Sequence, residues 1–156
     1  SRNCPNGCRC VSVKKTGRLV VIEEGHLKKE NAIAVGIRNM HTNELDFAKK
    51  NKLKIYDMKE ISSDGKTDLA DAIMSVARAF DGLYISIDID ALDPAFAPGT
   101  GYIEPGGMTT RELLYFIHRL KNLKNIGMWD IVEVNPDKDV NKMTVMAAAK
   151  LIVEMS

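Results

Sequence analysis

Two aspartates, Asp88 and Asp90, follow an apolar run in the segment SIDIDALDP. Residues two apart on an extended strand place their side chains on the same face. Two carboxylates that close repel each other, and each raises the pKa of the other unless a cation lies between them. Shared divalent ions would remove the repulsion and turn water into a nucleophile near neutral pH. We therefore predict that Asp88 and Asp90 bind metal; the alternative is a pair of solvated carboxylates at a strand end.

A third carboxylate, Glu133, follows a second apolar run in the segment WDIVEVNP, where the pair Asn-Pro ends the strand. A carboxylate in this place can bind a planar cation through paired hydrogen bonds. The alternative is an edge carboxylate or a salt bridge with an arginine. Asp93 precedes a proline and is predicted to fix its turn by accepting backbone N–H bonds. Asp130 is also predicted to be structural.

A glycine-rich loop, PGTGYIEPGGMT, covers residues 98–109. Glycines let a backbone approach a ligand closely or adopt positive φ. The loop lacks the Lys-Ser/Thr ending of a phosphate-binding loop. Its length is unusual for a plain connection and favours the wall of a site, although a rigid connection is the alternative.

The elements that must position these residues alternate along the chain. Segment 1–16 is expected to be irregular because it is rich in Arg, Asn, Pro and Gly. Thr42, Thr67 and either Thr109 or Thr110 are predicted helix caps. Apolar patterns predict strands at 18–23, 32–38, 53–56, 83–89 and 126–134, and helices at 42–50, 67–80, 109–120 and 140–155. This alternation predicts one α/β domain over residues 1–156, a parallel sheet between helices, with ligands at the strand carboxyl ends.

Composition and charge indicate which partners and which location to expect. The chain has 156 residues and a formal net charge of +1, from 22 basic and 21 acidic side chains. This balance favours neither nucleic acid nor an anionic membrane as a partner. Without an apolar run for a membrane span or a signal peptide, the default location is cytoplasmic. Cys4, Cys8 and Cys10 could form part of a zinc site, but free thiols are favoured because a fourth ligand is not evident.

Taken together, these segments resemble the agmatinase/arginase ureohydrolase family. The resemblance rests on AIAVGIR, SIDIDALDPAFAPGTGYIEPGG, MTTREL and DIVEVNP, in this order, and it runs from Ala32 to the C-terminus, with residues 1–31 weakly matched. PAFAPGTG with EPGG looks more like agmatinase than arginase. The resemblance implies a three-layer α/β/α sandwich with a mostly parallel sheet, like arginases and deacetylases but truncated. It also implies a homo-oligomer, either a trimer or a hexamer.

The same resemblance implies a function. A hydroxide bridging two manganese ions would attack a guanidino carbon, converting agmatine to putrescine and urea for polyamine biosynthesis. By matching positions, Asp88 and Asp90 are metal ligands, and Glu133 is the catalytic residue that binds and orients the substrate guanidinium. The family's other ligands, an upstream histidine and an Asp-x-His-x-Asp segment, are not recognisable. The ligand set is therefore incomplete, and a central metal-ligand segment is expected to be missing.

The three histidines do not fill this gap. His118 falls in a predicted helix and is expected to be a surface or packing residue. His41 could face a site, and Gly25-His26 faintly matches the family's first ligand. Two further hypotheses stay open. The chain could be a non-catalytic, ureohydrolase-like structural or regulatory subunit, or another metal hydrolase on the same fold. Manganese binding followed by urea release would separate the enzyme from the non-catalytic subunit.

Overall fold

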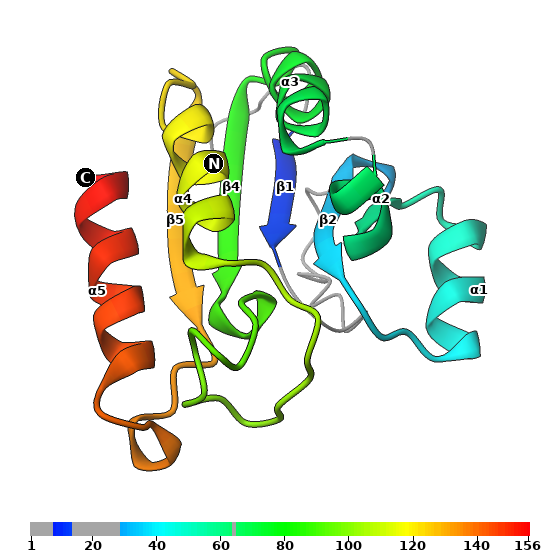
Figure 1. The fold of residues 1–156 in the computed structure, drawn as a ribbon. Coiled ribbons are helices and arrows are strands. Elements are labelled where there is room, and N and C mark those ends of the chain that lie inside the picture. Colours follow the sequence, from blue (N-terminus) through cyan, green and yellow to red (C-terminus); the bar gives the residue numbers. More distant parts are fainter. Residues whose placement is uncertain (1–7, 14–28, 64) are drawn as a thin grey trace.

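The computed structural model describes residues 8–13, 29–63 and 65–156, and it contains a five-stranded parallel sheet. The strands are β1 (Cys8–Val13), β2 (Ala32–Ile37), β3 (Lys54–Asp57), β4 (Gly82–Asp88) and β5 (Ile126–Val132). Their order across the sheet is β3-β2-β1-β4-β5. Because all pairs are parallel, the carboxyl ends meet at one edge, below which the long loop after β4 lies in Figure 1. The predicted α/β class is therefore confirmed.

Strand β1 corrects the prediction that residues 1–16 are irregular. Its backbone pairs on both sides, with Val11 opposite Ile33 of β2 and opposite Ile85 of β4. The turn-forming residues of segment 1–7 dominated the local signal, whereas CRCVSV carries valines at alternate positions. Pairing with two neighbouring strands is a tertiary effect that local propensity does not reveal. The predicted strand 18–23 lies outside the described residues.

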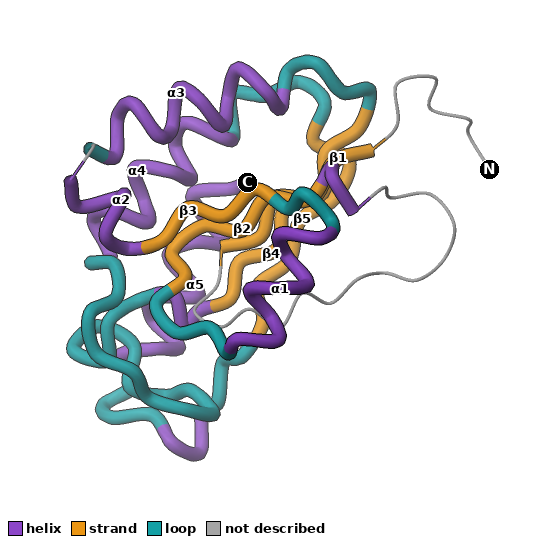
Figure 2. The backbone as a smooth tube through the Cα atoms, turned by 90° about the vertical axis from the view of Figure 1, so that its right-hand side faces the viewer, coloured by secondary structure: helices purple, strands orange, loops and turns teal. Residues whose placement is uncertain are grey.

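Helices lie on both sides of the sheet. They are α1 (Thr42–Lys50), α2 (Met58–Ser63), α3 (Lys66–Ala77), α4 (Thr110–Leu120) and α5 (Met143–Met155), with short 3-10 turns η1 (Lys29–Asn31), η2 (Ile89–Ala91) and η3 (Pro136–Lys138). Figure 2 shows α2, α3 and α4 on one side of the sheet and α1 on the other. The chain moves in one direction across the sheet from β2 to β3, and in the opposite direction from β3 to β4 and β5. Because crossovers between parallel strands are right-handed, the two directions place their helices on opposite sides of the sheet. The predicted sandwich is confirmed.

Of the three predicted helix caps, the structure confirms one and shows that two are wrong. Thr109 caps α4: its hydroxyl accepts the Glu112 N–H at 3.1 Å, and the Glu112 carboxylate accepts the Thr109 N–H at 2.7 Å. This is a reciprocal capping box. Thr42 is not a cap, because the extended residue before it, His41, takes that position. Thr67 is likewise not the cap of α3, because Gly65, with φ at 87°, takes that position. Helix α2 was not predicted at all, since six residues carry little periodicity.

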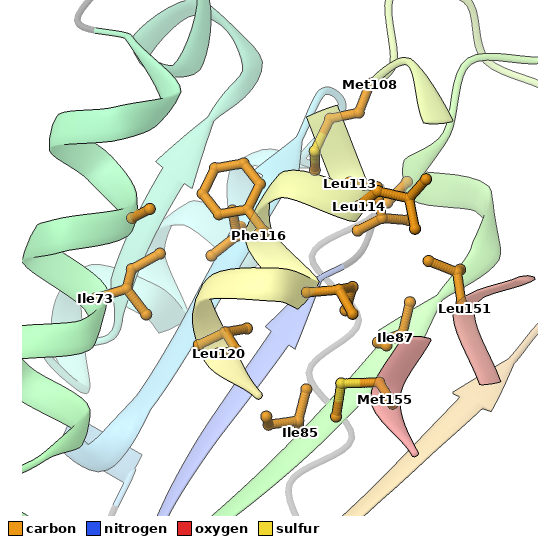
Figure 3. Packing of buried hydrophobic residues seen from close by; sticks show 14 of the residues in the cluster. Ile73, Ile85, Ile87, Met108, Leu113, Leu114, Phe116, Leu120, Leu151 and Met155 are labelled. Atoms are coloured by element: carbon orange, nitrogen blue, oxygen red, sulfur yellow. The ribbon is translucent and has the colours of Figure 1, made fainter. Parts of the chain in front are cut away.

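The core lies between the sheet and the layer of α3, α4 and α5. Figure 3 shows Leu151 of α5 beside Ile87 of β4, and Phe116 of α4 on the side of that helix nearer Ile73 of α3. All four side chains are at most 2% exposed. Burying residues of this size contributes roughly 1.5–3 kcal/mol each, so this layer holds β4 and the residues at its end in place. Within the described residues, no helix is both long and apolar enough to cross a membrane.

Candidate functional site

The carboxylate pair lies where β4 ends. We predicted a strand as far as Ile89, but β4 stops at Asp88, and Asp90 falls in the 3-10 turn η2. The Asp90 N–H donates to Asp88 Oδ1 at 3.2 Å. A tight turn, rather than the alternation of a strand, therefore brings the two side chains together. Each aspartate is only 9% exposed.

Asp88 and Asp90 are two neighbouring buried acids, and each makes ionisation of the other less favourable. Burial raises the pKa of Asp88 to about 8, and the Asp90 charge and a side-chain hydrogen bond with Asp90 act in the same direction. In the absence of a cation, Asp88 therefore holds a proton at neutral pH, and that proton relieves the repulsion between the two groups. A divalent cation would relieve the same repulsion while leaving both groups ionised.

The donor set suits a hard divalent cation, because carboxylate oxygens are the ligands preferred by Mg²⁺ and Mn²⁺. Asp88 and Asp90 can supply oxygen ligands from adjacent positions. Among the residues that the structure describes, no cluster of three or more His, Cys, Asp or Glu side chains is gathered for metal binding. The described residues thus fit one part of a metal site, and a complete coordination shell requires further ligands.

Glu133 reaches the same edge from the neighbouring strand. It directly follows Val132, which is the register partner of Asp88, and its charge is close enough to raise the pKa of Asp88 further. The backbone of Glu133 is left-handed, with φ at 66°. Such a conformation costs a non-glycine residue about 1–3 kcal/mol and is concentrated at functional sites. The structure therefore places Glu133 at the same edge of the sheet as Asp88 and Asp90, and its role in substrate binding stays a prediction.

One half of the long loop after η2 is fixed by Asp93. The Asp93 carboxylate accepts the N–H groups of Ala95, Gly106 and Gly107 at 2.9, 2.7 and 3.2 Å. These hydrogen bonds, led by that of Ala95, lower the pKa of Asp93. The residue is therefore structural, as predicted.

The other half of the loop is fastened beside Glu133. The Asn135 N–H donates to the Gly99 carbonyl at 2.8 Å, and the Gly99 N–H donates to the Thr144 hydroxyl at 2.7 Å. A Cβ added at Gly101 would lie 3.4 Å from Glu133 Oε2, so glycine lets the loop backbone approach this carboxylate. The loop is therefore held rigidly next to Glu133, and its role as the wall of a site stays a prediction.

Arg38 is the residue of this region that the sequence did not reveal. It follows β2, and its guanidinium donates to the carbonyls of Asp90, Ala91 and Glu104 at 2.7, 2.8 and 3.1 Å. Burial lowers the pKa of Arg38, whereas neighbouring carboxylates, first that of Asp90, raise it. The available signal was an arginine directly after a fully buried strand, at the sheet edge where ligands gather.

The remaining predicted residues lie away from the carboxylate pair or outside the described residues. His118 is on α4, and its ring bonds to Glu154 at 2.7 Å. His41 is the exposed N-cap of α1. The Tyr84 hydroxyl donates to Asp130, which agrees with a structural role for that aspartate. Two predicted candidates, Cys4 and His26, lie outside the described residues, and Cys8 and Cys10 belong to β1.

A shallow hollow of about 340 Å³ lies elsewhere on the molecule. It is lined by Lys121, Leu123, Ile126, Gly127, Met128, Trp129 and Met155. These residues surround the beginning of β5, whereas Asp88 pairs with the last residue of that strand. The hollow therefore has no part in the carboxylate site.

Gly107 makes the loop wall sensitive to one added methyl group. A Cβ at this position would lie 2.5 Å from the Asp93 nitrogen and 2.6 Å from both an Arg38 nitrogen and the Leu92 carbonyl carbon. Gly107→Ala is expected to lower the free energy of unfolding by about 1–3 kcal/mol, as overpacking does. Gly127→Ala is the matched control, because its nearest neighbour would be 3.8 Å away. Urea denaturation measures both, and equal losses would contradict the close packing at Gly107.

Comparisons with known proteins find relatives in both sequence and structure. A sequence model of the Arginase family matches residues 5–156. Formimidoylglutamase from Halalkalibacterium halodurans is 38% identical over 85% of this chain and 43% of its own length. Agmatinase from Enterobacter sp. is 35% identical, over 85% and 40%. The crystal structure of arginase from Bacillus subtilis superimposes with a TM-score of 0.79 and 32% identity, over 83% and 45%. The chain thus spans less than half the length of each relative.

Proposed function

This chain belongs to the arginase family of ureohydrolases, and from that premise we propose that it carries part of a metal-dependent site that hydrolyses a guanidino compound. The observation that carries the proposal is the buried pair Asp88 and Asp90 at the carboxyl end of a central parallel strand. Burying two adjacent acids is unfavourable without a compensating positive charge. A divalent cation supplies that charge, and the family supplies the reaction in which such an ion is used.

The residues of the site take separate roles in this proposal. Asp88 and Asp90 would hold manganese together with ligands from other residues, and the bound metal would activate water as the nucleophile. Glu133 would accept paired hydrogen bonds from the substrate guanidinium and so orient its central carbon. The braced loop beside Glu133 would form the wall that limits access of bulk water.

Agmatine is the substrate that we propose, giving putrescine and urea. The support is the loop sequence PAFAPGTG with EPGG, which looks more like agmatinase than arginase. Relatives named arginase, agmatinase and formimidoylglutamase match at similar identity, so the substrate must be chosen by measurement. Manganese binding by calorimetry, followed by urea release from agmatine and from arginine, tests the proposal. Faster release from arginine would overturn the choice of agmatine.

Glu133→Gln separates substrate binding from metal binding. The amide removes the negative charge that faces the guanidinium, so kcat/KM should fall about 10- to 100-fold, the range expected for a charge-assisted hydrogen bond. Manganese affinity should stay unchanged. Glu30→Gln, at an exposed position in η1, is the control. Turnover retained in Glu133→Gln would remove Glu133 from the proposed substrate site.

A non-catalytic, ureohydrolase-like subunit is the second candidate. It is favoured by one observation, namely that the described residues gather no cluster of three metal-ligating side chains around the aspartates. The two candidates differ in a direct measurement on the full chain. A chain that binds no manganese at millimolar concentration and releases no urea supports the non-catalytic subunit.

A further inference from the structure

We propose that Arg38 is a positioning residue that holds the Asp88–Ala91 turn in the shape needed to bind metal, an inference that rests on the proposed function. Its guanidinium bonds to two successive carbonyls of that turn, Asp90 at 2.7 Å and Ala91 at 2.8 Å. These contacts join residues more than fifty positions apart in the chain. The end of β2 is thereby tied to the turn that follows β4, across the intervening strand β1.

Arg38 is suited to positioning the turn because it binds backbone carbonyl oxygens. Its hydrogen bonds go to three main-chain carbonyls, those of Asp90 and Ala91 in the turn and that of Glu104 in the loop. A guanidinium locked onto a carboxylate would compete with a metal ion for the same oxygens. Bound to the carbonyls instead, it fixes the backbone from which the side chains project and places a positive charge behind them.

The same guanidinium also joins the turn to the loop wall. Its third hydrogen bond goes to the Glu104 carbonyl at 3.1 Å, and a Cβ on Gly107 would lie 2.6 Å from one of its nitrogens. Between turn and loop, the Met108 N–H donates to Ala91 at 3.0 Å, and the Asp93 N–H donates to Met108 at 2.8 Å. Arg38 therefore closes a small network in which turn and loop cannot move independently.

The buried surroundings of Arg38 require both its charge and its several hydrogen-bond donors. The carbonyls that Arg38 contacts belong to residues that are themselves shielded, since Ala91 is fully buried and Asp90 is 9% exposed. Carboxylates of Asp90, Asp93 and Glu104 face the guanidinium and compensate its charge. A planar fork with five donors can serve three carbonyls in different directions, whereas a lysine ammonium carries the charge without this geometry. Charge and geometry are thus separable by substitution.

The test compares Arg38→Met and Arg38→Lys with the unchanged chain. Arg38→Met should weaken manganese binding about 10- to 100-fold in calorimetry, the usual effect of removing a group that orients a ligand. Arg38→Lys should recover only part of that loss. In the metal-free chain, hydrogen exchange at the Met108 and Asp93 amides should become faster in both variants. Leu69→Ala, in the core at α3, is the control that lowers the melting temperature without changing manganese affinity.

Each outcome decides the matter. Faster exchange with unchanged manganese affinity would show that Arg38 only stabilises the loop, and it would overturn the positioning role. Full recovery in Arg38→Lys would show that charge alone matters and would overturn the geometric claim. If the unchanged chain binds no manganese, the proposed function fails first, and the exchange measurement alone decides whether Arg38 holds the turn.

Discussion

Asp88→Asn is expected to abolish manganese binding while making the metal-free chain more stable at pH 8. The amide keeps the size of the side chain but removes one of the two negative charges. Metal affinity should fall more than about 100-fold, because a lost ligand costs more than a lost supporting group. Urea release should disappear with the metal. The gain in stability follows because the buried repulsion with Asp90 no longer exists.

A gain in folding stability together with a loss of manganese affinity is expected for a metal ligand. Replacing a residue that only supports the fold would instead make the chain less stable. Replacing a functional residue often makes a protein more stable, because the original residue is arranged for binding a ligand rather than for stability. Calorimetry with manganese and urea denaturation in EDTA measure the two halves separately. Asp46→Asn, on the exposed side of α1, is the matched control and should change neither. Wild-type manganese affinity in Asp88→Asn would refute the ligand assignment.

The sequence predicted this pair because its signal is local. Asp88 and Asp90 follow an apolar strand in a parallel sheet, and the general rule for such sheets places ligands at that edge. The reason given for their proximity was nevertheless wrong. Strand alternation does not align them; a 3-10 turn does, after the strand ends at Asp88. Both geometries bring residues two apart together, so their predicted proximity is confirmed although the local structure differs, and metal binding by the pair stays a prediction.

Arg38 could not be found by the same reasoning. Its contacts depend on the strand order β2-β1-β4, which places the end of β2 near the turn after β4. That order depends on β1, a strand that was predicted to be irregular. Asp139 was missed for a different reason: it accepts the N–H groups of Thr144 and Val145 at 3.0 Å, a local contact whose spacing of five and six residues is longer than that of a usual helix cap. Contacts fixed by tertiary arrangement leave no periodic pattern in the sequence.

The raised pKa of Asp88 predicts an unusual pH dependence for the metal-free chain. Its pKa is about 8 in the folded chain, against roughly 3.9 for an unfolded aspartate. Between these values the folded state holds one proton more than the unfolded state. The stabilising contribution is therefore fully present below about pH 4 and is lost as pH rises toward 8. The slope is at most about 1.4 kcal/mol per pH unit, for one proton.

Urea denaturation in EDTA from pH 5 to pH 8 should therefore show stability falling with pH. The acids with lowered pKa values, such as Asp93, act in the opposite direction, but they titrate below this range. Asp88→Asn should flatten the curve because the titrating group is gone. Manganese should reverse the trend, since its binding displaces the proton and strengthens as that proton leaves. An identical slope in Asp88→Asn and the unchanged chain would show that another group titrates, and that the buried pair does not share a proton.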